Sequence, residues 1–122
     1  MSQKPQSFVF VAKTAPYGSS KPQLCLDAAL ATAVFEQSVS YVFTGDGVYQ
    51  LLKDQNAEAI QAKTLGNAME TLDLYGIEQV YVDGDSLKSR GLSGDDLVLQ
   101  PQEVSASEIS DIIHRSDHVF IL

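Results

Sequence analysis

Residues 8–43 read FVFVAKTAPYGSSKPQLCLDAALATAVFEQSVSYVF and contain, in order, a strand, a helix and a second strand. The run from Phe8 to Ala12 is apolar throughout, which is typical of a strand buried on both faces of a parallel sheet. A serine at position 19 or 20 followed by Pro22 predicts a helix start with a hydroxyl cap, and the helix runs to about Glu36. Alternation over 39–43 predicts the second strand. This segment therefore predicts a parallel strand–helix–strand unit.

The predicted helix carries apolar residues around more than one face. Such a helix is expected to be largely buried, either by the sheet or by a partner subunit. The apolar residues are Leu24, Leu26, Ala28, Leu30, Ala31, Val34 and Phe35.

The rest of the chain continues the alternation of strands and helices. Further strands are predicted at 80–82, 98–99 and 119–122, a polar loop at 53–62, and a helix over about 65–72 that ends before a left-handed Gly76. Short helical turns are predicted at 48–52 and 87–91. The pattern Ser105-Ala106-Ser107-Glu108 is a capping box, and the helix it opens places Ile109, Ile112 and Ile113 on one face and Arg115 in its last turn.

These elements predict one domain over residues 1–122 of the α/β class. The expected architecture is a three-layer α/β/α sandwich around a mostly parallel, five-stranded sheet. Right-handed crossovers and short loops favour the flavodoxin-like strand order 2-1-3-4-5.

Composition narrows the classes of function. The chain has 122 residues, and 8 basic against 16 acidic residues give a net charge of −8. This charge argues against direct binding to nucleic acid or anionic lipid, because both depend on clusters of Lys and Arg. No apolar stretch approaches the roughly 20 residues of a membrane span. Since Cys25 is the only cysteine, there is no internal disulfide, and a reducing, cytoplasmic location is expected.

Ligand sites in such folds gather at the carboxyl ends of the strands, which here are followed by residues 13–20, 45–47 and 83–86. The first loop precedes a helix and offers a place for a phosphate or flavin, but it matches neither a Walker loop nor a GxGxxG motif. A phospho-accepting receiver domain is disfavoured because acidic residues after the first strand and a lysine near the last strand are missing. The loop carboxylates offer metal ligands, but a solvated acidic surface explains them better. They are Asp83, Asp85, Asp95 and Asp96.

Three further side chains carry reactive chemistry. Cys25 lies inside the first helix between Leu24 and Leu26, and it is expected to pack as a small apolar residue rather than react. His114 is explained by its place near the end of the last helix, where a cation complements the helix dipole. A metal site made with His118 is not favoured. The residues alone therefore predict no catalytic residue, no metal and no cofactor.

Several stretches nevertheless carry a family resemblance in order along the chain. The most specific is DGVYQLL at 46–52, and the others lie at 8–10, 14–18, 26–31, 74–79 and 86–92. Together they resemble the TusC/DsrF family of sulfur-relay subunits, within the DsrE/DsrF/DsrH-like group, and TusC is the closer of the two.

The resemblance implies a cytoplasmic heterohexamer, a dimer of trimers built with TusB-like and TusD-like sister subunits. Such a complex passes persulfide sulfur toward 2-thiolation of the wobble uridine of tRNA. In the catalytic sister subunit the sulfur-carrying cysteine lies just after the third strand, eight residues before the glycine that ends a short helix containing arginine. Counting eight residues back from Gly91 reaches Asp83. An aspartate cannot carry a persulfide, so the resemblance implies a non-catalytic subunit.

Some alternatives stay open at this stage. The chain is expected to be an accessory subunit rather than an enzyme by itself, and Asp83 is expected to face solvent or to make a structural contact. Tyr49, Leu51 and Leu52, with the first helix, are expected to pack against sister subunits, and a homo-oligomer is possible for the isolated chain. The competing functions are a DsrF-like subunit of a sulfur-oxidation complex, a sulfurtransferase that uses Cys25, and a nucleotide-binding or flavin-binding module.

Overall fold

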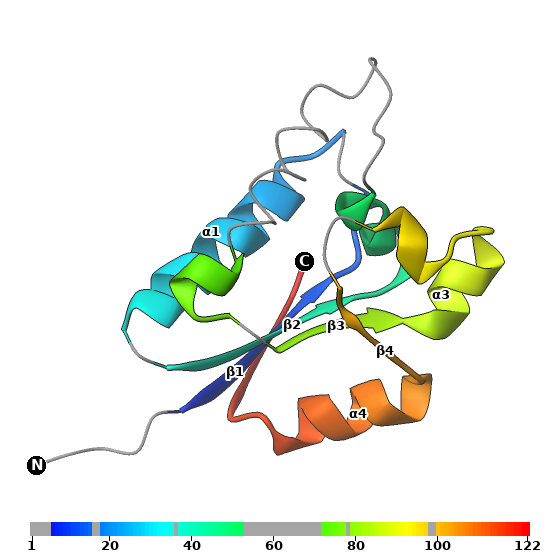
Figure 1. Cartoon of the computed structure of the whole chain (residues 1–122). Coiled ribbons are helices and arrows are strands. Elements are labelled where there is room, and N and C mark those ends of the chain that lie inside the picture. The colour runs from blue at the N-terminus through cyan, green and yellow to red at the C-terminus, as the bar shows by residue number, and fades with distance from the viewer. Residues whose placement is uncertain (1–5, 16–17, 36, 53–71, 78, 98–99) are drawn as a thin grey trace, which may run out of the picture.

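The computed structural model describes residues 6–15, 18–35, 37–52, 72–77, 79–97 and 100–122. Five parallel strands form one sheet in the order β4-β3-β2-β1-β5 (Figure 1). The α/β class and the parallel five-stranded sheet are therefore confirmed. The strands are β1 (Ser7–Ala12), β2 (Ser38–Phe43), β3 (Gln79–Asp83), β4 (Gln102–Val104) and β5 (His118–Ile121).

The predicted strand order, 2-1-3-4-5, is wrong. The first four strands lie side by side in chain order, and only the last connection returns across the sheet, to place β5 beside β1. Right-handed crossovers that proceed in one direction place their connections on one face, so the returning crossover needs the other face. Its helix, α4 (Ala106–Arg115), lies on the opposite side of the sheet from α1 (Lys21–Val34) (Figure 1). The three-layer arrangement is thus confirmed.

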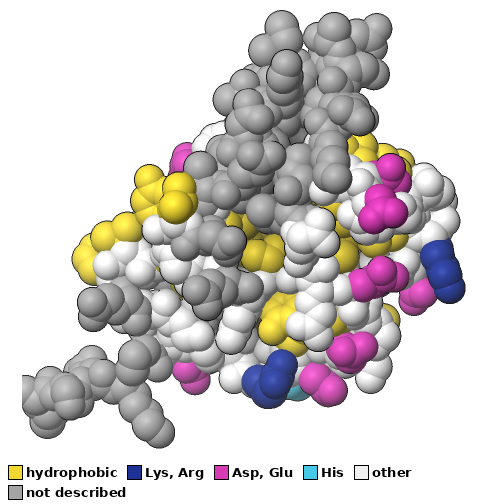
Figure 2. Space-filling view, viewed as in Figure 1, with side chains coloured by type: hydrophobic (Ala, Val, Ile, Leu, Met, Phe, Trp, Pro, Cys, Tyr) yellow, Lys and Arg dark blue, Asp and Glu magenta, His cyan; other side chains and the backbone are white. Residues whose placement is uncertain are grey.

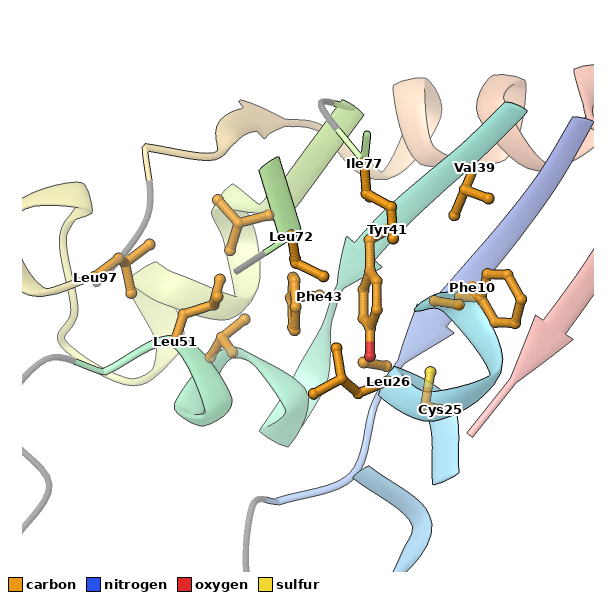
Figure 3. Packing of buried hydrophobic residues seen from close by; sticks show 14 of the residues in the cluster. Phe10, Cys25, Leu26, Val39, Tyr41, Phe43, Leu51, Leu72, Ile77 and Leu97 are labelled. Carbon is orange, nitrogen blue, oxygen red and sulfur yellow. The ribbon is translucent and has the colours of Figure 1, made fainter. Parts of the chain in front are cut away.

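The core is divided between the two faces of the sheet. On the α1 side, Phe10, Tyr41 and Phe43 pack against the helix and the shorter turns (Figure 3). On the α4 side, Val9, Val11 and Val42 pack against Ile112. Because β1 contributes alternate side chains to both clusters, it is buried on both faces, as its apolar sequence predicts.

The helix α1 buries only one of its faces against the sheet. Cys25, Leu26 and Ala29 are buried, but Leu24, Val34 and Phe35 are 55%, 64% and 74% exposed. The apolar residues on the outer face are exposed to solvent. The sheet therefore buries only one face of the helix. Figure 2 shows apolar side chains over α1 and acidic side chains along the side of α3 and α4.

The helix ends follow the sequence closely. Ser105 Oγ accepts from the Glu108 N–H and a Glu108 carboxylate oxygen accepts from the Ser105 N–H, so the predicted capping box of α4 is present. At α1, Pro22 lies in the first turn, but Ser20 makes no side-chain cap bond; Ser19 Oγ instead accepts from the Lys21 N–H.

Shorter elements join the strands. They are the 3-10 helices η1 (Gly45–Leu51), η2 (Leu72–Tyr75) and η3 (Gly94–Asp96), and the helix α3 (Gly84–Ser89). The left-handed Gly76 is confirmed by a φ of 84°. The predicted loop at 53–62, the helical residues 65–71 and the strand at 98–99 lie outside the described residues, and the fourth strand is found at Gln102–Val104. Within the described ranges, no helix has both the length and the apolar character needed to cross a membrane.

Candidate functional site

The loops that follow β1, β2 and β3 meet beside the carboxyl ends of these strands, as predicted. The main-chain N–H of Thr44 donates to the carbonyl of Ala12, and the Thr44 hydroxyl donates to Asp83 across a distance of 3.0 Å. Because β1, β2 and β3 are neighbours and run parallel, their carboxyl ends necessarily converge. The candidate site is therefore the set of side chains carried by these three loops.

Asp83 stands at the centre of this site and is fully engaged in hydrogen bonds. It is the last residue of β3 and the N-cap of α3, where its Oδ1 accepts from the Asp85 N–H at 3.2 Å. Its Oδ2 accepts from the hydroxyls of Ser86 at 2.7 Å and of Thr44 at 3.0 Å. Asp83 therefore makes a structural contact that joins β2, β3 and α3.

Two backbone donors of the second loop, those of Gly45 and Gly47, are also occupied. The Gly45 N–H donates to Ser86 Oγ at 2.9 Å, and the Gly47 N–H donates to the carbonyl of Thr44. Gly45 has a φ of 55°, in the left-handed region that favours glycine. A bound phosphate would need free N–H groups at this place. Since the Gly45 and Gly47 donors bond within the protein, these two N–H groups are not free to hold an anion.

Arg90, at the end of α3, is paired with a carboxylate other than Asp83. Its Nε and Nη2 donate to Asp46 Oδ1 at 3.2 and 2.9 Å, and its Nη1 donates to the carbonyl of Ser86 at 3.2 Å. The guanidinium also lies 5.9 Å from the centre of the Tyr49 ring. Arg90 therefore connects α3 to η1 and is not free to bind a substrate anion.

Gln50 links η1 to the loop that follows β1. It is fully buried, and its Nε2 donates to the carbonyl of Thr14 at 2.8 Å, while the Thr14 hydroxyl donates to the carbonyl of Leu122 at 2.6 Å. The Oε1 of Gln50 has no hydrogen-bond partner among the described residues. Nothing in the sequence pattern singled out Gln50 or Thr44, because an isolated polar residue beside a strand end has no periodicity to mark it.

Two of the side chains expected to contact sister subunits belong to the chain's own core. Leu51 is fully buried in the main core cluster, and Leu52 packs against that cluster. Tyr49 is half-buried beside Arg90. The prediction that all three serve a subunit interface is therefore wrong for Leu51, and the reason is that η1 turns its apolar side inward over the carboxyl ends of the strands.

Cys25 is buried inside the molecule, away from these loops. Its side chain is 0% exposed and lies in the core cluster with Leu26 and Tyr41 (Figure 3). Burial raises the pKa of the Cys25 thiol, an effect that the nearby Tyr41 hydroxyl partly offsets, and burial also raises the pKa of Tyr41 well above its usual range. Within the part of the chain that the structure describes, the Tyr41 hydroxyl has no hydrogen-bond partner of adequate geometry. A neutral, enclosed thiol is a poor nucleophile, which agrees with the packing role predicted for it.

We expect Cys25 to resist thiol reagents in the native protein. Reaction requires an opening of the core, and an opening free energy of about 4 kcal/mol would slow labelling roughly 1000-fold relative to the unfolded chain. The rate is measured with a chromogenic disulfide, with and without denaturant. A Cys25→Ser/Ser20→Cys variant, whose new thiol replaces an exposed side chain before α1, is the rapidly labelled control. Rapid native labelling of the unmodified chain would contradict the buried placement.

The histidines and acidic loops lie elsewhere on the surface. His114 is exposed in the last turn of α4, and its Nδ1 lies 2.7 Å from the carbonyl of Ser110. His118 stacks on Phe8 and contacts Gln6. Asp96 forms a capping box with Ser93, the N-cap residue of η3. Among the residues that the structure describes, no group of three or more His, Cys, Asp or Glu side chains is placed to hold a metal ion.

The fold and this site define a class of small α/β proteins in which loops converge beside the ends of parallel strands. The particular family follows from comparison with known sequences. Residues 6–121 match the DsrE/DsrF-like family model, and the chain belongs to that family.

Curated relatives cover almost the whole chain. A protein TusC homolog from Vibrio vulnificus is 37% identical over 107 residues, which is 88% of this chain and 91% of the relative. The intracellular sulfur oxidation protein DsrF from Allochromatium vinosum is 34% identical over 134 aligned positions, which cover 98% of each chain. Both names that the sequence resemblance brought together are therefore found among its relatives.

Solved structures confirm the fold. The ychN protein from E. coli superposes with a TM-score of 0.78 at 22% identity and covers 96% of this chain and 99% of its own. The protein MTH1491 from Methanobacterium thermoautotrophicum superposes with a TM-score of 0.66 at 15% identity.

Proposed function

We propose that this chain is a non-catalytic subunit of a sulfur-relay complex, which passes persulfide sulfur toward 2-thiolation of the wobble uridine of tRNA. The complex would be cytoplasmic, with TusB-like and TusD-like sister subunits in a dimer of trimers. The TusC homologs among the relatives support this assignment, at 30–37% identity over most of the chain.

One observation carries the proposal. The described strand ends converge on Asp83. By the family resemblance, this is the position expected for the sister subunit's sulfur-carrying cysteine. The only thiol of the chain, that of Cys25, is buried. A carboxylate cannot form a persulfide, and this one already accepts three hydrogen bonds. The chain would therefore support a partner's cysteine rather than carry sulfur itself.

Exposed apolar side chains support the need for a partner. Five of them lie on α1, at its end and on η2, where α1 and η2 contact each other. Monomeric proteins rarely leave large apolar side chains bare in groups, so these side chains are candidates for the contact with sister subunits. They are Leu24, Val34, Phe35, Leu74 and Tyr75.

A second function is supported by one specific observation. DsrF, a sulfur oxidation protein, matches 98% of this chain at 34% identity, against 88% for the Vibrio TusC homolog. A subunit of a sulfur-oxidation complex would use the same fold and the same non-catalytic Asp83. The Cys25-dependent sulfurtransferase and the nucleotide-binding module have less support, because the thiol is enclosed and the N–H donors of Gly45 and Gly47 are occupied.

Genetic complementation with the Cys25→Ser variant tests the proposal. Deleting the gene is expected to remove 2-thiouridine from tRNA, measured by mass spectrometry of digested nucleosides, and both the wild-type chain and Cys25→Ser are expected to restore it. Failure of Cys25→Ser to restore thiolation, at normal protein levels, would overturn the non-catalytic role. Intact thiolation with loss of sulfur oxidation would instead favour the DsrF-like function.

Co-purification tests the partner surface separately. A tagged chain is expected to capture two small α/β subunits encoded beside it, one of which carries a cysteine after its third strand. Val34→Lys is expected to weaken this capture, because Val34 is 64% exposed on α1. Lys21→Glu, a charge change at the exposed start of the same helix, is the matched control that should leave capture intact.

A further inference from the structure

The strand β5 forms a bare edge of the sheet. Among the residues that the structure describes it pairs only with β1, so no described strand lies beside the backbone groups on its outer side. Its side chains are also open to solvent, with Val119, Phe120 and Ile121 exposed by 38%, 46% and 52%. An exposed apolar edge of this kind is a template for another strand.

The opposite edge of the sheet is protected in the usual ways. The strand β4 has three residues, Pro101 precedes it, and the exposed Glu103 places a charge in its middle. Short length, proline and charge are devices by which soluble proteins prevent edge-to-edge association. The strand β5 is also short, with four residues, but the sequence from His118 to Leu122 contains no proline and no Asp, Glu, Lys or Arg. The contrast between β4 and β5 indicates that β5 is the edge at which another strand can pair.

An aromatic row strengthens the bare edge on the α1 side of the sheet. Phe120 stacks on Phe10 with 5.2 Å between the ring centres, and it lies 6.3 Å from Phe8, which in turn stacks on His118. These contacts hold β5 in place while half of the Phe120 ring stays exposed. The edge is therefore ordered before any partner binds, which lowers the entropic cost of adding a strand.

The charge pattern and the sequence of β5 together favour a second copy of this chain as the occupant. Two copies, each with a net charge of −8, repel each other unless they meet on an uncharged surface. No acidic or basic side chain lies between Val119 and Leu122, the residue that follows β5. Two copies can therefore meet there without bringing carboxylate side chains together. The strand is also self-complementary: an antiparallel pair centred on Phe120 places Val119 opposite the partner's Ile121 and His118 opposite the partner's Leu122, so no two ionisable side chains face one another.

We propose that two copies of this chain associate through β5, in an antiparallel pair that joins their sheets into one continuous sheet. The edge is short, so the buried area is well below the roughly 800 Å² per partner of a standard interface. We therefore expect a dimer with a dissociation constant in the micromolar range. The pairing does not depend on the relay function proposed above, because it concerns the purified chain alone.

Complementary charges test both the surface and the register. Ile121→Lys and Val119→Glu, each measured alone by analytical ultracentrifugation, are expected to dimerise at least about 10-fold more weakly than the wild type. Mixing the two variants is expected to restore dimers, because the antiparallel register then pairs the new lysine with the new glutamate and the remaining Val119 with Ile121. Circular dichroism checks that both variants are folded.

Val34→Lys is the matched control, since it places the same charge on an apolar side chain that is exposed on α1. It is expected to keep the dimer intact while losing sister subunits. A wild-type chain that stays monomeric up to about 100 µM would overturn the proposal. So would a dimer that Ile121→Lys does not weaken, or one that mixing the two charged variants does not restore. Failure of the wild-type chain to capture sister subunits, with the dimer unchanged, would count against the relay assignment alone.

Discussion

Replacing Gly47 by alanine is expected to destabilise the protein by about 3–5 kcal/mol, a large share of the roughly 5–15 kcal/mol that holds a domain of this size folded. A Cβ at position 47 would lie 1.9 Å from the carbonyl oxygen of Ala12 and 2.6 Å from its carbon. Both atoms are backbone at the end of β1, the strand that pairs on both sides and is buried on both faces, so neither can give way cheaply.

The measurement is urea unfolding of Gly47→Ala and of the wild type, followed by circular dichroism. Gly94→Ala is the control, because a Cβ at Gly94 meets no atom within 4 Å and the residue has no left-handed φ. We expect that control to change the free energy of unfolding by less than about 0.5 kcal/mol. A Gly47→Ala protein as stable as Gly94→Ala would show that η1 does not lie as closely over β1 as described.

The local structure of this chain was largely predictable, and its long-range order was not. The apolar run in β1 and the capping box at Ser105 specify their elements through nearest neighbours, and both are confirmed. The position of β5 depends instead on which face α4 covers, and a single apolar stripe at Ile109, Ile112 and Ile113 fits either face equally well. For this reason the sequence predicted the number of strands in the sheet correctly and their order wrongly.

The same distinction applies to the candidate site. The convergence of the three loops follows from parallel strands, and the burial of Cys25 follows from its apolar neighbours in a helix. The contacts among Thr44, Asp83 and Ser86 join residues 39 or more positions apart, except for the local pair of Asp83 and Ser86. No spacing rule connects such distant residues. Asp83 was identified through a family resemblance, which gave its position and not its hydrogen bonds.

Asp83→Ala is expected to lower stability by about 2–4 kcal/mol. The change removes the N-cap of α3, typically worth about 1 kcal/mol, and it leaves the hydroxyls of Thr44 and Ser86 without their shared charged acceptor. Ser86 is buried and Thr44 is half-buried, so solvent replaces these bonds only in part. Asp85→Ala, which removes the same charge from an exposed carboxylate two residues away, should cost less than about 1 kcal/mol.

Asp83→Asn separates this structural role from a chemical one. The amide keeps one oxygen for the Asp85 N–H and can donate from its nitrogen to a rotated hydroxyl, so we expect about half of the loss seen with Asp83→Ala. If Asp83 serves only to hold β2, β3 and α3 together, tRNA thiolation in cells should follow the amount of folded protein in both variants. Loss of thiolation by Asp83→Asn at full protein levels, with sister subunits still bound, would contradict that role. It would show instead that the negative charge acts on the partner's cysteine.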